Sequence, residues 1–196
     1  MLLQDKLKNY RLILASASPR RRELLAACDL DFVLADKFEC EECYPDDFAA
    51  DKVAEYLSQL KSNAYPHALG ERDILLTADT VVILGDKILG KPHSEAEAVE
   101  MISSLSGATH KVITGVTLRT AEQTISFSAE SLVSFRALEA EEIAYYVEKY
   151  RPMDKAGAYG IQEWIGYTAI ERIEGSFYNV MGLPVQRLYS ALKELV

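Results

Sequence analysis

Three consecutive arginines directly after a Ser-Pro pair are the first residues whose types and spacing indicate chemistry. Ser18 has the character of a helix N-cap, and Pro19 suits the first helical position, where its missing N–H costs nothing. Arg20, Arg21 and Arg22 would then lie in the first turn, where the helix dipole makes each cation unfavourable by ~0.3–1 kcal/mol. A bound anion would offset this cost, because backbone N–H groups and guanidinium groups both suit phosphate. The segment predicts a phosphate site; the alternative is that the arginines pair with surface carboxylates.

A lone carboxylate, Asp79, interrupts the apolar and β-branched run from Ile74 to Leu84. Burying a carboxylate in such a strand costs free energy unless a metal ion, a cation or an N–H group meets it. A carboxylate in this setting is more often functional than structural. We therefore predict a functional role for Asp79.

A short hairpin after this strand would bring a lysine close to Asp79. Gly85-Asp86 is typical of a two-residue turn, and counting from this turn places Lys91 opposite Thr80, next to Asp79. The alternative is a lysine that only protects an edge strand from pairing.

The small residues between Asp154 and Gln162 would let the backbone approach a ligand or another segment closely. Gln162 can both donate and accept hydrogen bonds, as recognition of a nucleotide base requires. The alternative is a tight structural turn. Glu42, in an acidic loop, and Lys61, on the following helix, are two further candidates that alone would be ordinary solvated charges.

Common signatures of other chemistries are missing from the sequence. It contains no G-x-x-x-x-G-K-[ST], no G-x-G-x-x-G and no nucleophile elbow. The cysteines, Cys28, Cys40 and Cys43, are odd in number and do not suggest a disulfide framework. The C-x-x-C at 40–43 encloses two glutamates, which should raise a thiol pKa, and lacks two further zinc ligands. Neither a zinc site nor a redox pair is favoured.

The composition limits the class of protein. The chain has 196 residues, 49% of them apolar, and a net charge of −9, which argues against a nucleic-acid polymer as partner. A small phosphorylated ligand remains compatible, because local positive charge decides its binding. No apolar run approaches the ~20 residues of a membrane span, and the polar N-terminus lacks a signal-peptide core. We expect a cytoplasmic protein without a membrane partner.

Helices and strands that must position these side chains follow from apolar periodicity. Ser94 and Glu97 form a capping box that opens one helix, and Gly107 ends it. Further helices are expected at 19–28, 47–64 and 140–150 and from 184 onward, and strands at 12–15, 32–35, 74–84, 87–91, 111–119, 124–135, 164–173 and 177–181.

Mixed hairpins and crossovers predict an α/β fold class, with one domain over residues 1–196 and a mixed central sheet flanked by helices. The length would suit two lobes with a cleft between them.

Six segments together resemble the Maf (septum-formation) family of nucleoside triphosphate pyrophosphatases. They occur in family order and span almost the whole chain; they read LASASPRRRELL (14–25), ADTVV (78–82), GKP (90–92), LSG (105–107), MDKAGAYGIQ (153–162) and VMGLP (180–184). The resemblance implies an elongated fold similar to inosine triphosphate pyrophosphatase, with the active site in the cleft. It also implies hydrolysis of a nucleoside triphosphate to the monophosphate and pyrophosphate with Mg²⁺ or Mn²⁺, and it is compatible with a homodimer.

Roles for individual residues are implied by the same resemblance. Asp79 matches the family's proton acceptor, and Glu42 matches a glutamate of the site; together they are expected to hold the divalent ion. The side chains expected to bind the triphosphate are Ser16, Ser18, Arg20, Arg21, Lys61 and Lys91.

Three marker positions make the chain similar to the family branch that acts on dTTP and UTP. They are Arg20, Thr80 and Gln162, of which the last two are expected near the base or sugar. The branch that favours 7-methyl-GTP usually has another residue in place of Arg20 and Gln in place of Thr80. The chain departs from the family pattern around Lys61, and at Glu163, where Gly often follows the glutamine.

Two alternatives to dTTP and UTP hydrolysis stay open on the sequence. One is the same reaction on a modified nucleotide such as 7-methyl-GTP. The other is a non-catalytic, nucleotide-binding regulator of septum formation.

Overall fold

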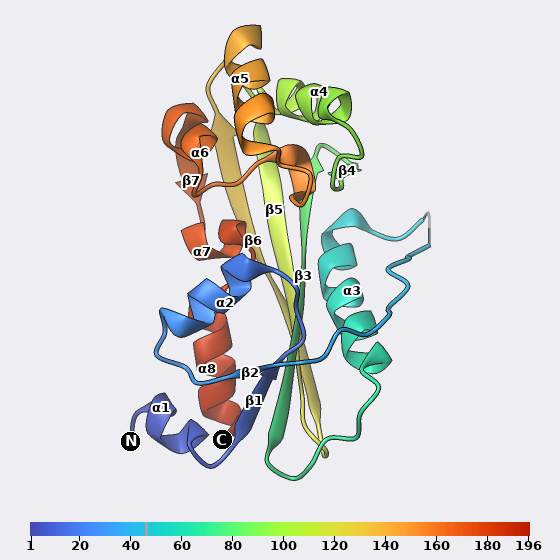
Figure 1. Cartoon of the computed structure of the whole chain (residues 1–196), viewed down its shortest axis with the longest axis vertical. Helices are drawn as coiled ribbons and strands as arrows, with labels where there is room; N and C mark the ends of the chain where they lie inside the picture. Colours follow the sequence, from blue (N-terminus) through green and yellow to red (C-terminus); the bar gives the residue numbers. More distant parts are fainter. Residues whose placement is uncertain (46) are drawn as a thin grey trace. The chain divides into compact units, whose positions relative to one another are not determined.

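The computed structural model describes residues 1–45 and 47–196. Asp46, which belongs to the acidic loop expected at 39–47, lies outside the described residues. The described chain has an α/β fold in which helices flank a mixed sheet (Figure 1). Within this part of the chain, no helix has the length and apolar character that crossing a membrane would require.

The sheet is mixed, as predicted. Its strands lie in the order β2-β1-β3-β5-β6-β7, with β4 paired to β3. Strand β1 pairs in parallel with β2 and β3, whereas β3–β4 and β6–β7 are antiparallel. The strands are β1 (Arg11–Leu14), β2 (Val33–Leu34), β3 (Asp73–Leu84), β4 (Lys87–Leu89), β5 (Thr109–Arg119), β6 (Thr124–Phe135) and β7 (Ile170–Glu174).

The helices carry the apolar faces that cover the sheet. Three of them, α3, α5 and α8, are amphipathic along their length, which is the pattern of helices that pack on a core. The helices are α1 (Leu3–Leu7), α2 (Pro19–Ala26), α3 (Ala50–Ala64), α4 (Glu95–Leu105), α5 (Ala140–Tyr150), α6 (Trp164–Ala169), α7 (Phe177–Met181) and α8 (Val185–Leu195), with a short 3₁₀ helix, η1 (Ala156–Ala158).

The chain divides into two compact units. The first unit comprises Met1–Asp79, Thr114–Ala129 and Gly182–Val196, and the second comprises Thr80–Ile113 and Glu130–Met181. The single domain expected from the sequence stays a prediction.

Helix α3 of the first unit packs tightly on the sheet. It lies on one side of the strands, and α2 and α8 lie on the other (Figure 1). A Cβ atom at Gly115 would stand 2.2 Å from the carbonyl oxygen of Ala54, so only glycine permits this approach. The Thr77 hydroxyl donates to the Ser58 carbonyl oxygen at 2.7 Å, and the Ser58 and Thr117 hydroxyl oxygens are 2.8 Å apart. These contacts fix α3 against β3 and β5.

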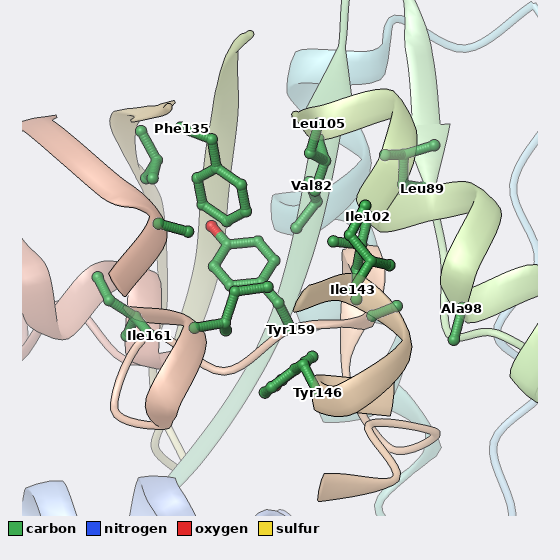
Figure 2. Close-up of a cluster of buried hydrophobic side chains, with 14 of the residues drawn as sticks. Val82, Leu89, Ala98, Ile102, Leu105, Phe135, Ile143, Tyr146, Tyr159 and Ile161 are labelled. Carbon is green, nitrogen blue, oxygen red and sulfur yellow. The ribbon is translucent and has the colours of Figure 1, made fainter. Parts of the chain in front are cut away.

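The second unit has a core of aliphatic and aromatic side chains. Figure 2 shows Tyr159 beside Phe135, with Tyr146 and Ile161 on neighbouring segments. The Phe135 and Tyr159 rings meet edge to face at 5.0 Å. Side chains from β3, β4, α4, α5 and the segment around η1 share this core, which ties that segment to the rest of the unit.

The hairpin prediction is confirmed at the turn and wrong beyond it. Gly85 has φ +59°, and the ladder runs from Leu84–Lys87 to Val82–Leu89. It stops there, so Lys91 does not pair opposite Thr80. The Gly90 carbonyl instead accepts a hydrogen bond from the Gly157 N–H at 3.0 Å, which draws the chain out of the ladder.

The predicted strand at 164–173 is wrong over its first half, because Trp164–Ala169 forms α6. Its aromatic and β-branched residues favour a strand locally, but packing overrides this propensity. A Cβ atom at Gly166 would stand 1.7 Å from the Ile161 carbonyl oxygen, so the helix is folded back against that carbonyl. The Thr168 hydroxyl bonds to the Trp164 carbonyl at 3.0 Å, four residues back.

The predicted strand at 177–181 is also wrong, because this segment is helix α7. The Ser176 hydroxyl accepts from the Asn179 N–H at 3.3 Å, a capping contact that starts the helix. The helical turn also directs the Asn179 side chain inward, where it donates to the Val112 carbonyl at 3.1 Å.

Helix boundaries differ less. Helix α3 begins at Ala50 rather than 47, and it buries Ala54 and Ser58 while Tyr56 and Leu60 are only half-buried. The buried face of α3 is thus rotated about the helix axis from the predicted one, and the hydroxyl contacts of Ser58 account for this rotation. Helix α1 was not expected, although its Leu3 and Leu7 are buried.

A buried histidine should make stability depend on pH. His110 is 1% exposed and hydrogen bonded to the Tyr159 hydroxyl at 2.7 Å, and burial lowers its pKa to about 4. The unfolded chain therefore binds a proton at higher pH than the folded chain, so stability falls as the pH drops from about 6.5 to about 4. This shift corresponds to a loss of about 3 kcal/mol. We expect His110→Gln to lack this component in urea titrations across that range.

The exposed His93 provides the control. His93→Gln should keep the parent's pH dependence, and identical pH dependence in the parent and His110→Gln would contradict the prediction.

Candidate functional site

One ammonium group brings two of the predicted carboxylates together in the first unit. Lys61 Nζ lies 2.6 Å from Asp79 Oδ1 and 2.9 Å from Glu42 Oε2. The Asp79 and Lys61 side chains are only 13% and 17% exposed, whereas that of Glu42 is 46% exposed. Since charges that leave water need partners, Lys61 compensates the carboxylate that the sequence places inside an apolar strand.

The local fold explains why these three side chains meet. Lys61 is in the last turn of α3, where the helix dipole favours a cation. Ser58 lies one turn earlier, and Thr77 lies two residues before Asp79 on the same face of β3. The hydrogen bond between the Thr77 hydroxyl and the Ser58 carbonyl therefore sets the distance between helix and strand near the ion pair.

Arg21 connects the start of α2 to other segments of the first unit through side-chain hydrogen bonds. Its Nη1 donates to Ser16 Oγ at 3.1 Å and to the Ala78 carbonyl at 2.9 Å, and its Nε donates to the Gly182 carbonyl at 2.8 Å. Burial lowers the pKa of this guanidinium, while the nearby Asp79 carboxylate acts in the opposite direction. The carbonyl groups of Gly182 and of Ala78, the residue before Asp79, are thus held by one side chain, which carries its charge close to Asp79.

The start of α2 follows the sequence prediction with one difference. Ser18 is the N-cap residue and Pro19 is at the first helical position, but the Ser18 side chain makes no capping hydrogen bond. The Ser18 N–H instead donates to Ser16 Oγ at 3.3 Å. Arg20 is half-buried here, and Arg22 donates to the Ala17 carbonyl at 3.1 Å.

The remaining predicted residues belong to the second unit. Thr80 is half-buried and follows Asp79 directly in β3, so their side chains lie on opposite faces of the strand. Lys91 is exposed, in the loop after β4. Gln162 is half-buried, and its Oε1 is buried without a hydrogen-bond partner among the described residues. The segments of Lys91 and Gln162 meet through the bond from Gly157 to Gly90.

Sequence reasoning did not predict the charged pair that Lys155 and Glu163 form near Gln162. Lys155 Nζ lies 3.1 Å from Glu163 Oε1, with side chains 9% and 19% exposed. A lysine and a glutamate at the two ends of a Gly- and Ala-rich turn were the available signal. The sequence indicates the small residues of this turn and Gln162 as candidates, and marks Glu163 only as a departure from the family pattern.

At Cys40, the pKa of the thiol is shifted in the direction that the sequence predicts. Burial raises the pKa of this thiol, and the Glu42 carboxylate adds to the rise. A raised pKa makes a thiolate scarce at neutral pH, so Cys40 is a poor nucleophile.

A divalent cation suits the oxygen donors present. Asp79 and Glu42 both contact Lys61 Nζ, so their carboxylates lie close together, and carboxylate oxygens are ligands that Mg²⁺ and Mn²⁺ prefer. No group of three or more His, Cys, Asp or Glu side chains that could hold a metal occurs in the described ranges. An ion held by these two carboxylates would take its other ligands from phosphate or water.

Comparison with known proteins gives consistent matches over nearly the whole chain. The family model for Maf-like protein matches residues 11–195. A dTTP/UTP pyrophosphatase of Bacteroides thetaiotaomicron is 52% identical over 189 residues, covering 96% of this chain and 98% of the relative. A dTTP/UTP pyrophosphatase of Porphyromonas gingivalis strain W83 is 52% identical over 192 residues, covering 97% and 96%. A solved HAM1 protein from Coxiella burnetii aligns with a TM-score of 0.46 at 13% identity, covering 94% of this chain and 99% of that one.

Replacing Arg21 with lysine should test whether its hydrogen bonds stabilise the fold, because the positive charge is kept. In Arg21→Lys, a single ammonium cannot reproduce the planar fork that reaches Ser16 and two carbonyl oxygens. We expect the free energy of unfolding in urea to fall by about 1–3 kcal/mol. Arg22→Lys, on the same helix, should change it little; equal stabilities of all three proteins would refute the role.

Proposed function

The chain belongs to the Maf family, and on this premise we propose that it hydrolyses dTTP and UTP to the nucleoside monophosphate and pyrophosphate. The observation that carries the proposal is the cluster of Asp79, Lys61 and Glu42, a partly buried acid and cation of the kind that phosphoanhydride hydrolysis needs. The naming of relatives with about half their residues identical as dTTP/UTP pyrophosphatases supports the choice of substrate.

In the proposed reaction, the Asp79 carboxylate accepts a proton from the attacking water. The water oxygen forms a bond to phosphorus, and the phosphoanhydride bond breaks so that pyrophosphate leaves with the electron pair. Lys61, bonded to Asp79 at 2.6 Å, orients this carboxylate. Orientation matters because catalysis of this kind depends on placing the water in line with the leaving group.

A divalent ion held by Asp79 and Glu42 would neutralise phosphate charge, which is the chemistry that such an ion supplies when bound. The residues proposed to contact the triphosphate are Ser16, Ser18, Arg20, Arg21, Lys61 and Lys91, and those proposed to contact the base or sugar are Thr80 and Gln162. The net charge of −9 supports a free nucleotide rather than a nucleic-acid polymer as substrate, and we propose that the enzyme acts in the cytoplasm.

The experiment that tests this function is pyrophosphate release from a panel of nucleoside triphosphates, first with Mg²⁺ and then with Mn²⁺. We expect selective cleavage of dTTP and UTP. A preference for 7-methyl-GTP would contradict the choice of base, and nucleotide binding without turnover would favour a regulator.

Asp79→Asn should abolish most turnover while the fold persists. The amide cannot accept the water's proton, so we expect kcat to fall by about 10²–10⁴-fold. Asp86→Asn, in the exposed turn after β3, is the matched control and should keep the parent's rate. Near-parent turnover in Asp79→Asn, with circular dichroism unchanged, would exclude the proposed role.

Arg20→Ala should weaken substrate binding and base preference. Removing a guanidinium that contacts substrate is expected to raise KM by about tenfold with a smaller effect on kcat. Arg22→Ala serves as the control. An unchanged KM and an unchanged preference among dTTP, UTP and CTP would count against Arg20.

A further inference from the structure

A buried ion pair closes the turn that carries Gln162. Lys155 stands at the start of this turn and Glu163 at its end, and their side chains meet at 3.1 Å. Lys155 also lies 2.7 Å from the more exposed Asp154 carboxylate. Removing such charges from water is costly, so a buried pair contributes to one defined conformation more than to stability.

Tyr146 joins the same carboxylate from the core. The tyrosine is fully buried on α5; its hydroxyl donates to Glu163 Oε2 and accepts from the Gly160 N–H at 3.0 Å. Burial raises the pKa of Tyr146, and the Glu163 carboxylate raises it further. The hydroxyl therefore keeps its proton and its donor role throughout the pH range of the folded protein.

The backbone between Lys155 and Glu163 is closely packed and has unfavourable backbone angles. Gly157 and Ala158 have φ of +67° and +58°, a conformation that is costly for alanine. A Cβ atom at Gly157 would stand 3.0 Å from both methyl groups of Val82, and one at Gly160 would stand 2.9 Å from the Glu163 carboxyl carbon. The turn is packed against β3 on one side and against the ion pair on the other.

Gln162 is held between two fixed neighbours. Ile161 is 4% exposed and belongs to the core seen in Figure 2, and Glu163 is bonded to Lys155 and Tyr146. Gln162 Oε1 is buried and has no hydrogen-bond partner among the residues described. An unpaired buried acceptor costs about 1–3 kcal/mol, so the Gln162 amide would gain a hydrogen bond by turning its Oε1 toward a donor of a bound ligand.

We propose that Glu163 is a positioning residue for base recognition, which with Lys155 and Tyr146 holds the turn so that Gln162 offers Oε1 to an N–H group of the pyrimidine base. This inference rests on the proposed function. Glu163 acts through Gln162 and does not itself contact the substrate.

The first test is Glu163→Gln, which keeps an acceptor for Tyr146 but removes the carboxylate charge that pairs with Lys155 across the turn and leaves it only the more exposed Asp154. We expect KM for UTP and dTTP to rise by about tenfold, kcat to stay within about twofold, and discrimination against CTP to fall by about tenfold. Glu148→Gln, at an exposed position of α5, is the matched control and should keep the parent's constants.

A double variant separates positioning from stability. Lys155→Met with Glu163→Gln removes both charges of the pair, so no buried ammonium is left with only the exposed Asp154 carboxylate as partner, and the stability lost in Glu163→Gln should return. The raised KM and the loss of discrimination should persist, because the two ends of the turn are no longer joined. Lys155→Arg, which keeps a cation for Glu163, should stay within about threefold of the parent in KM.

Amide hydrogen exchange gives a readout that needs no turnover. The Gly160 N–H should be protected in the parent and should exchange at least about tenfold faster in Tyr146→Phe, which removes its acceptor. A parent with this protection but no pyrimidine activity would reject the proposed function and leave the geometry of the turn standing. Parent-like KM and base discrimination in both Glu163→Gln and the double variant would overturn the positioning role.

Discussion

The ammonium group of Lys61 is the constraint on which the first unit depends. A carboxylate in the middle of β3 and a second one from the loop before α3 both bond to it, at 2.6 and 2.9 Å. Without that cation, Asp79 would be a largely buried charge with its nearest acid beside it, an arrangement that costs several kcal/mol. The contacts that set the distance between α3 and the sheet therefore also set the position of the Asp79 carboxylate relative to Lys61. The close contact at Gly115 and the hydroxyl groups of Ser58 and Thr77 have this effect.

The second unit also pairs a buried lysine with a carboxylate, but in a different structural element. Its buried cation, Lys155, is paired with Glu163 at the end of a turn rather than between a helix and a strand. Both units thus place a lysine where a carboxylate would otherwise be buried alone. In the first unit the acid is the group proposed to react, and in the second the acid holds the backbone that carries Gln162. The proposed functions divide between the two units: hydrolysis is proposed for the cluster around Asp79, and base selection for the cluster around Glu163.

Local signals in the sequence were sufficient for most elements and for selecting Asp79 as a candidate acid. Helix α5 and strand β6 have the predicted bounds, because capping residues and β-branched runs mark them without help from distant contacts. Asp79 was found because a charge in an apolar strand is visible in sequence. Helices α6 and α7 were missed, because the contact of Gly166 with Ile161 and the burial of Asn179 arise only in three dimensions. Family resemblance named Lys61, Asp79 and Glu42 as site residues, but neither it nor their spacing predicted that Lys61 pairs with both carboxylates.

The parallel pairing of β1 with β3 has a consequence for how the gene can change in length. The pairing fixes the register over Arg11–Leu14 and Asp73–Leu76, a few residues before Asp79. Successive side chains of a strand point to opposite faces, so a codon gained or lost between Leu76 and Asp79 would turn the carboxylate away from Lys61 and present its neighbour instead. The connection at 65–72, which precedes the fixed register, can vary in length without this inversion. Divergence in this lineage should therefore accumulate insertions and deletions in that connection and leave the spacing within β3 constant.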